Sequence, residues 1–186
     1  MKKWNELPKV MQNDKVKYYY DILQEHEKEL KLKRAFDIIC SLIMIIILSP
    51  VLIILSVMIK LDSKGPVLFK QVRVTTYGRK FKIWKFRTMV NNADRLGTQV
   101  TTKGDARITR MGHLLRKVRL DELPQLFNVL KGDMTFVGTR PEVPKYTAHY
   151  TEEMMATFLL PAGVTSRTSI EYKDEEKLLE NAENAD

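Results

Sequence analysis

Residues 38–59, with the sequence IICSLIMIIILSPVLIILSVMI, contain no charged side chain. About 20 consecutive apolar residues are enough for an α-helix to cross the hydrocarbon core of a bilayer. Pro50 lies near the middle of this stretch and removes one backbone hydrogen bond from a helix. Ser49 precedes it and can donate its hydroxyl to a carbonyl that the proline leaves free. The stretch therefore predicts a membrane helix that is interrupted near its centre.

Both flanks of this stretch are basic, with Lys33 and Arg34 before it and Lys60 and Lys64 after it. Because the orientation of a membrane helix follows the flank that is richer in Lys and Arg, these flanks predict no orientation. Each half of the stretch has about 11 residues, or about 16 Å of helix, which is half of a hydrocarbon core. Two arrangements follow: a spanning helix with a kink at Pro50, or a re-entrant hairpin that returns through the same leaflet.

The composition of the 186-residue chain limits the classes of partner and of metal site that the protein can have. A net charge of +8 predicts an anionic partner, which is a nucleic acid, an anionic lipid or a phosphorylated substrate. Cys40 is the only cysteine, which excludes an internal disulfide and a thiolate metal site. The three histidines are scattered without the spacing of zinc ligands, and the common glycine-rich nucleotide loops are absent.

The rest of the chain shows recognisable periodicities. Residues 1–35 predict a solvated lead-in helix or a partner-binding helix. Residues 67–74 and 80–87 alternate like two strands of a β-hairpin, although basic and aromatic strands also bind single-stranded nucleic acid. Residues 107–119 predict a basic amphipathic helix, which suits either a lipid interface or a surface packed on a core. Residues 146–160 predict one more helix.

A pair of adjacent carboxylates, Asp121 and Glu122, follows the basic helix. Neighbouring residues on a helix do not point the same way, so we expect the two side chains to divide their work. One carboxylate attacks a phosphorus atom, and the other holds Mg²⁺ together with substrate phosphates. Considered alone, such a pair is more often a solvated feature of a helix N-terminus. Its position beside a membrane segment and a basic surface favours chemistry on a phosphate carried by a lipid.

A second candidate element for phosphate binding is Arg140, which precedes Pro141 and is therefore held in an extended backbone. A rigidly placed guanidinium suits bidentate contact with a phosphate, although an Arg-Pro pair is usually just a turn. Lys85 and Arg87 are further candidates for phosphate contacts.

Three motifs carry a family resemblance: KFRTM at residues 85–89, DARITR at residues 105–110, and LDELPQLFNVLKGDM at residues 120–134. From about residue 33 to residue 165, the chain resembles the monotopic phosphoglycosyl transferases of the bacterial sugar transferase family. This resemblance implies transfer of a phospho-sugar from a UDP-sugar to polyprenyl phosphate, with release of UMP, at the cytoplasmic face of the bacterial inner membrane. Mg²⁺ is the implied cofactor.

The resemblance also implies roles for individual residues. Asp121 is similar to the nucleophile that forms a covalent phospho-sugar intermediate, and Glu122 is similar to the Mg²⁺ ligand. Ser49 and Pro50 resemble the break in a re-entrant helix, with Arg34 at the lipid headgroups. Further expected contacts with substrate are Lys85, Arg87, Arg107, Arg119, Asp133, Arg140, Pro141 and Lys173.

This chain departs from the family pattern in two places. Thr139 replaces the first proline of a Pro-Arg-Pro element that helps to bind the uridine nucleotide. The segment from Pro161 carries an extra residue relative to the usual Pro-Gly-Ile-Thr-Gly, and Ser166 replaces its last glycine. An Asn-Gly-Arg element that normally follows is absent, and Lys173 lies near its register. Sugar specificity is expected in this region.

The expected architecture is mainly α with a small β-hairpin, in which a re-entrant membrane segment and interfacial amphipathic helices surround a compact cytoplasmic catalytic domain. Residues 1–34 form the polar lead-in, residues 35–61 the membrane segment, and residues 62–186 the catalytic domain. The resemblance implies a C-terminal amphipathic helix that is missing here, so we expect the catalytic domain to be truncated at its C-terminus. We expect no nucleic-acid partner, and a second copy of the chain or other glycosyltransferases of its pathway are candidate partners. The alternative is a membrane-anchored basic binding or scaffold protein without catalysis.

Overall fold

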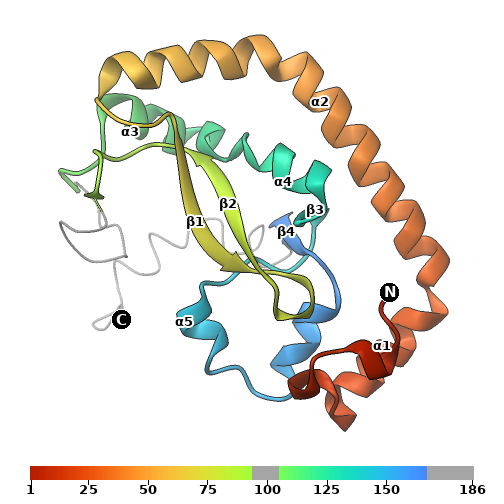
Figure 1. Ribbon diagram of the computed structural model, residues 1–186. Coiled ribbons are helices and arrows are strands. Elements are labelled where there is room, and N and C mark those ends of the chain that lie inside the picture. The colour runs from red at the N-terminus through yellow and green to blue at the C-terminus, as the bar shows by residue number, and fades with distance from the viewer. Residues whose placement is uncertain (94–104, 167–186) are drawn as a thin grey trace.

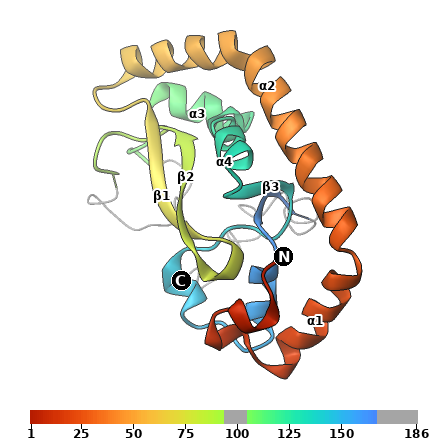
Figure 2. The ribbon, with the colours of Figure 1, turned by 45° about the vertical axis from the view of Figure 1, so that its right-hand side comes forward.

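The computed structural model describes residues 1–93 and 105–166, and its long second helix arches around a compact body (Figures 1 and 2). Within these residues the α-helices are α1 (Asp14–Glu25), α2 (Glu27–Asp62), α3 (Arg110–Lys117), α4 (Gln125–Lys131) and α5 (Pro144–Thr147). The strands are β1 (Leu68–Val74), β2 (Lys80–Phe86), β3 (Met134–Val137) and β4 (Ala162–Thr165). Single 3₁₀ turns are η1 (Trp4–Glu6), η2 (Lys9–Met11), η3 (Thr76–Gly78), η5 (Leu120–Glu122) and η6 (Met154–Leu159).

The apolar stretch lies in α2, which runs for 36 residues and contains Pro50. The Ser49 hydroxyl donates to the carbonyl of Ile46 at 2.8 Å. In a regular helix the backbone N–H of residue 50 would bond this same carbonyl, so the serine satisfies the acceptor that proline leaves free. The helix is continuous, and the predicted break between two helices is instead a bend, visible in Figure 1.

Most apolar side chains of α2 are exposed. The helix is long and apolar enough to cross a membrane. Examples of large exposed side chains in its middle are Ile43, Met44, Ile46, Ile47, Ile53 and Ile54. Because a soluble protein rarely leaves so long an apolar surface in water, this exposure indicates a membrane protein.

The hairpin of β1 and β2 confirms the predicted pair of strands. The strands are antiparallel, with Leu68 opposite Phe86 and Val74 opposite Lys80. The turn is η3, in which Tyr77 and Gly78 both have positive φ. Alternate residues of β2, Phe81 and Ile83, are buried in a core with Val129 of α4 and Met134 of β3. The hairpin therefore packs on α4, the helix that follows the carboxylate pair in the chain.

A parallel pair of strands, β3 and β4, was not predicted. Met134 lies opposite Ala162, and Val137 lies opposite Thr165. Gly163 is required here, because a β-carbon at this position would overlap the backbone of Gly138. The pair places the segment that follows β3 beside β4.

The helix predicted over residues 146–160 is wrong. The structure has the short helix α5 and the turn η6, with irregular backbone between them. Tyr150 folds back and stacks on Phe158, with ring centroids 5.3 Å apart. The Thr151 hydroxyl accepts a bond from the backbone N–H of Met154, a local contact that competes with continuous helix. Tertiary packing and this side-chain bond together outweigh the helical pattern.

The N-terminal segment is not merely solvated, which corrects one expectation. Val16 and Tyr20 of α1 are buried with Leu7 and Met11 in a core that also holds Val74 and residues of η6. The Tyr19 hydroxyl lies 3.0 Å from a carboxylate oxygen of Glu153. Residues 1–25 are therefore docked on the body by an apolar face.

The basic amphipathic helix is shorter than predicted and divides its apolar side chains. Leu115 is fully buried and Met111 partly buried against the C-terminal part of α2, whereas Leu114 and Val118 are 52% exposed. Gly112 allows a close approach of the helix to the carbonyl of Thr88, where a β-carbon would overlap. The helix thus packs on the core with one edge and leaves another apolar edge uncovered.

Candidate active site

The carboxylate pair lies on η5, a single turn between α3 and α4. Arg119 begins this turn in the left-handed conformation, with φ of 54°, which is uncommon for a residue other than glycine. Leu120 and Leu123 pack against the core between α2 and α3. With these leucines anchored, the Glu122 side chain reaches Lys85 of β2. Strained backbone of this kind is concentrated at functional sites.

The two neighbouring carboxylates have different surroundings. Glu122 forms an ion pair with Lys85, with Nζ and Oε1 2.6 Å apart, and each side chain is about one quarter exposed. Burial raises the pKa of Asp121, and the charge of Glu122 raises it further, while Lys85 and Arg116 oppose this effect. The sequence expectation that the pair is not symmetric agrees with this difference in environment.

A cavity of about 380 Å³ lies beside Glu122 and is lined by several predicted residues, whereas Asp121 is not in its lining. Its lining includes Lys85, Arg119, Glu122, Arg140 and Pro141. Met44 of α2 also lines it, so the membrane helix forms part of the wall. Cationic side chains beside a carboxylate pair and an apolar helix suit a substrate that carries phosphate and a lipid.

A larger cavity, of about 1020 Å³, lies between the first part of α2 and the body and shares Arg119 and Arg140 with the smaller one. Asp37 of α2 lies in its wall and is buried. The Asp37 carboxylate accepts bonds from the Thr135 hydroxyl at 2.6 Å and from the backbone N–H of Phe136 at 3.2 Å. No role for Asp37 was predicted, although its position four residues after Lys33, at the edge of an apolar stretch, is a signal in the sequence.

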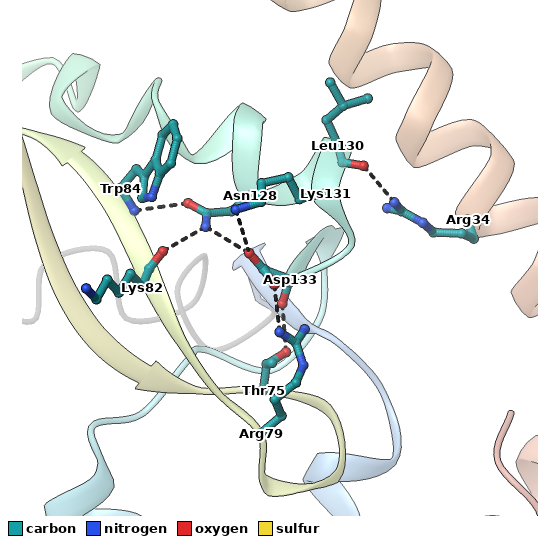
Figure 3. Close-up of polar contacts among 9 residues, drawn as sticks. All are labelled: Arg34, Thr75, Arg79, Lys82, Trp84, Asn128, Leu130, Lys131 and Asp133. Carbon is teal, nitrogen blue, oxygen red and sulfur yellow. Dashed lines mark hydrogen bonds and ion pairs between the residues drawn. The ribbon is translucent and has the colours of Figure 1, made fainter.

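Arg34 is also held by the body. Its Nη1 and Nη2 donate to the carbonyls of Val129 and Leu130, at 2.6 and 2.9 Å, and Figure 3 shows the second of these bonds. These carbonyls belong to the last turn of α4, where a cation also compensates the helix dipole. The predicted contact of Arg34 with lipid headgroups stays a prediction, because in the structure the guanidinium caps α4.

Asp133 belongs to a polar network between the end of α4 and the β1–β2 hairpin (Figure 3). Its carboxylate forms an ion pair with Arg79 at 2.9 Å, and its carbonyl accepts the Thr75 hydroxyl at 2.7 Å. Asn128 donates to the carbonyl of Lys82 and accepts from the backbone N–H of Trp84. The structure does not bring Asp133 into the lining of the smaller cavity.

Arg87 directly follows β2, is 5% exposed and packs against the C-terminal end of α2. Its Nη2 donates to the carbonyls of Ile59 and Ser63 and to the Ser63 hydroxyl. Burial lowers its pKa, and among the described residues its Nε and Nη1 have no hydrogen-bond partner. The structure therefore shows that Arg87 contacts the end of α2. The predicted contact of Arg87 with phosphate stays a prediction.

Arg107 is paired with Asp105, with Nη2 and Oδ2 2.6 Å apart, and donates to the carbonyl of Ala93. Hydrogen bonds from Arg107 lower the pKa of Asp105 to about 2. Lys173 lies outside the described residues. Two further cations, not predicted for the site, lie near it: Arg116, whose charge acts on Asp121, and Arg73, which lines the smaller cavity.

The site can be tested for its fit to Mg²⁺. Within residues 1–93 and 105–166, no group of three or more His, Cys, Asp or Glu side chains is placed to hold a metal ion. Mg²⁺, however, is commonly held by one or two carboxylates with the substrate's phosphates supplying other ligands. Asp121 and Glu122 meet that smaller requirement, and Glu122 Oε2 is not the oxygen that bonds Lys85. These two carboxylates therefore fit a Mg²⁺ ion that would enter the site together with the substrate's phosphates.

Comparison with known proteins gives a consistent family. The family model for bacterial sugar transferases matches residues 28–186. An Aeromonas hydrophila protein named UDP-N-acetylgalactosamine-undecaprenyl-phosphate N-acetylgalactosaminephosphotransferase is 46% identical over 123 residues, which are 66% of this chain and 29% of that protein. The UDP-glucose:undecaprenyl-phosphate glucose-1-phosphate transferase of Escherichia coli (strain K12) is 40% identical, over 82% of this chain and 34% of that protein.

A third relative is closer in length. It is a Bacillus subtilis (strain 168) protein named uncharacterized sugar transferase EpsL, and it is 37% identical over 75% of this chain and 68% of its own length. The chain thus spans only about a third of the Aeromonas and Escherichia proteins but two thirds of this one. With the matched region covering both α2 and the carboxylate turn, the chain belongs to the bacterial sugar transferase family.

Proposed function

We propose that this protein transfers a sugar 1-phosphate from a UDP-sugar to undecaprenyl phosphate and releases UMP. The observation that carries the proposal is a single cavity that is lined by Glu122, Lys85 and Arg140 and by Met44 of the apolar helix. Glu122 is the direct neighbour of Asp121 in the chain. The printed names of the Aeromonas and Escherichia relatives support both the acceptor and the class of reaction. Members of this family are transferases, and the basic cavity suits a diphosphate.

The proposed chemistry has two displacements at one phosphorus atom. In the first, a carboxylate oxygen of Asp121 forms a bond to the sugar-bearing phosphorus, and the bond from that phosphorus to UMP breaks. UMP leaves with the bonding electron pair. In the second, a phosphate oxygen of undecaprenyl phosphate bonds the same phosphorus, and the Asp121 carboxylate leaves. The products are the undecaprenyl diphospho-sugar and the original enzyme.

The surrounding residues favour this course. The raised pKa of Asp121 reflects a partly desolvated carboxylate, which is a better nucleophile than a fully hydrated one. Lys85 keeps Glu122 oriented and adds positive charge near the transferred phosphate. Mg²⁺, when bound through Glu122 and the substrate's phosphates, would neutralise charge on the diphosphate.

We also propose that α2 is re-entrant and that the catalytic body lies at the cytoplasmic face of the inner membrane. The support is that both ends of α2 contact the same body: Arg34 bonds the end of α4, and the carbonyls near Ser63 bond Arg87. A helix anchored at both ends to a body on one side of a bilayer must enter and return through that side.

The test is release of UMP by the purified protein in nanodiscs with undecaprenyl phosphate, Mg²⁺ and a panel of UDP-sugars. We expect release with one or two donors, and a loss of at least about 10³-fold for Asp121→Asn, because the amide cannot form the acyl phosphate. The matched control is Glu152→Gln, a change at an exposed carboxylate, which should leave the rate unchanged.

Trapping provides the second readout. A donor with labelled sugar phosphate should leave label on denatured wild-type protein and none on Asp121→Asn. Full activity of Asp121→Asn, or release of UMP without any trapped label, would contradict the covalent route. Absence of release with every donor, together with strongly salt-dependent lipid binding, would instead favour a basic membrane-binding protein.

A further inference from the structure

Arg73, on β1, is fixed by hydrogen bonds on both of its sides. Its Nε and Nη2 donate to the Oε1 of Gln71, at 3.1 and 2.7 Å, and its Nη1 donates to the carbonyl of Pro141 at 3.1 Å. The next residue of the strand, Val74, donates its backbone N–H to the carbonyl of Glu142 at 2.9 Å. Two consecutive residues of β1 therefore hold the segment that follows Arg140.

The segment before Arg140 is held from the other side by β4. The backbone N–H of Gly138 donates to the carbonyl of Thr165 at 3.1 Å, and the N–H of Gly163 donates to the carbonyl of Thr139 at 2.7 Å. Arg140 is thus placed between two anchored stretches of backbone. This anchoring supplies the rigidity that the chain does not obtain from a proline at position 139, where it has threonine.

The charges at this place favour an anion. Arg73 and Arg140 both line the smaller cavity, together with Lys85 and Arg119. The Arg73 guanidinium is half-buried, and burial lowers its pKa. The charge of Glu142 opposes this effect, and the charge of Arg140 adds to it to a smaller extent. Two guanidinium groups that repel each other in a partly desolvated wall are stabilised by an anion between them.

Arg73 also has donors to spare. A guanidinium carries five N–H groups, and the bonds to Gln71 and Pro141 use three of them. Its position along the hairpin separates it from the carboxylate end of the cavity. Lys85 lies opposite Phe69, four residues before Arg73 on β1, which is about 13 Å along a strand. Because the two phosphates of a diphosphate share one bridging oxygen, Arg73 and Lys85 can bind them only through their long side chains. The bonds to Gln71, which lies between Phe69 and Arg73 on β1, turn the Arg73 guanidinium toward Lys85.

We propose that Arg73 and Arg140 form the subsite for the nucleotide-side phosphate of the UDP-sugar, and that Arg73 also positions the Arg140-Pro141 segment. The sugar-side phosphate then lies at Lys85, Glu122 and Asp121. This assignment rests on the proposed function, which supplies the donor.

Direct binding of UMP and of uridine by the full chain in nanodiscs tests the subsite. For Arg73→Gln we expect UMP to bind about tenfold more weakly or worse, and uridine to change by less than about threefold, since only UMP carries the phosphate. Arg73→Lys should recover part of the UMP affinity, because it keeps the charge and loses the forked geometry. The KM for the UDP-sugar should rise, while the KM for undecaprenyl phosphate should not.

Lys70→Gln is the matched control. Lys70 is on the same strand, exposed, with its ammonium 4.9 Å from the ring centroid of Trp84, and it does not line the smaller cavity. UMP affinity of Arg73→Gln within twofold of wild type would overturn the subsite, provided that the wild type binds UMP and turns over. A wild type that neither binds UMP nor releases it would overturn the proposed function as well. If Arg73→Gln does not fold, an unchanged UMP affinity of Arg73→Lys would overturn the subsite.

Discussion

The two ends of α2 contact the same body by different chemistry. The first end uses hydrogen bonds and charge: Arg34 caps the carbonyls of α4, and Asp37 accepts bonds from Thr135 and Phe136. The second end has an apolar core, in which Leu55 and Ile59 pack with Phe86 and Leu115, in addition to the bonds from Arg87 to Ile59 and Ser63.

Between these ends the helix has few contacts. The middle exposes Ile46, Ile47 and Ile53, and its polar contact is internal, from Ser49 to Ile46. This difference indicates which part of the helix can contact lipid. Polar attachment suits a region beside water and headgroups, whereas the exposed apolar middle suits hydrocarbon.

The most direct test of this description of α2 is whether its two ends lie on the same side of a membrane. Single cysteines at Lys28 and at Lys64, both exposed, would be placed in a Cys40→Ser background. We expect an impermeant maleimide to label both positions from the same side of sealed vesicles, because both ends of α2 are attached to one body. Labelling from opposite sides would show a spanning helix, and detergent-solubilised protein is the control for reactivity.

The largest effect on stability is expected at the polar end. Asp37→Ala leaves the Thr135 hydroxyl and the Phe136 N–H without their buried acceptor, which should lower the free energy of unfolding by about 2–4 kcal/mol. Thermal unfolding of the detergent-solubilised protein measures this. Asp21→Ala, which removes an exposed ion pair with Lys17, should cost less than about 1 kcal/mol. Equal effects of the two changes would show that the polar attachment is not needed.

A smaller effect is expected from Arg87→Met at the apolar end. The change removes bonds to Ile59 and Ser63 but also removes a buried charge that has two nitrogens without partners among the described residues. We expect a loss of about 1–2 kcal/mol in the same unfolding experiment. Loss of UMP affinity with stability retained would instead support the predicted phosphate contact of Arg87.

Local patterns predicted much of the fold. The apolar stretch and the alternation in the hairpin are local signals, and the structure has both α2 and the pair β1–β2. The parallel pair β3–β4 depends on a close approach of Gly138 and Gly163, far apart in sequence, which no local period reports. The helix predicted over residues 146–160 was wrong for a related reason, because Tyr150 packs on Phe158 instead.

The candidate site was predicted in part. Lys85, Arg119, Glu122 and Arg140 were named from their motifs, and the structure brings them to one cavity. Arg73 was missed because an arginine in a basic, alternating strand resembles an ordinary exposed position. Its contact with Pro141 is visible only after β1 and the segment after β3 are placed together. Arg87 and Asp133 were named as substrate contacts, and the structure gives each a partner within the fold.

Asn128 has a consequence for assembly. Its side chain bonds the N–H of Trp84 and the carbonyl of Lys82, two of the backbone groups that β2 directs away from β1. An open strand edge is a template on which another chain can add a strand. Here one amide group occupies the place of that strand, so the outer edge of the hairpin is closed at its centre. Another chain therefore cannot add a strand along the centre of this edge.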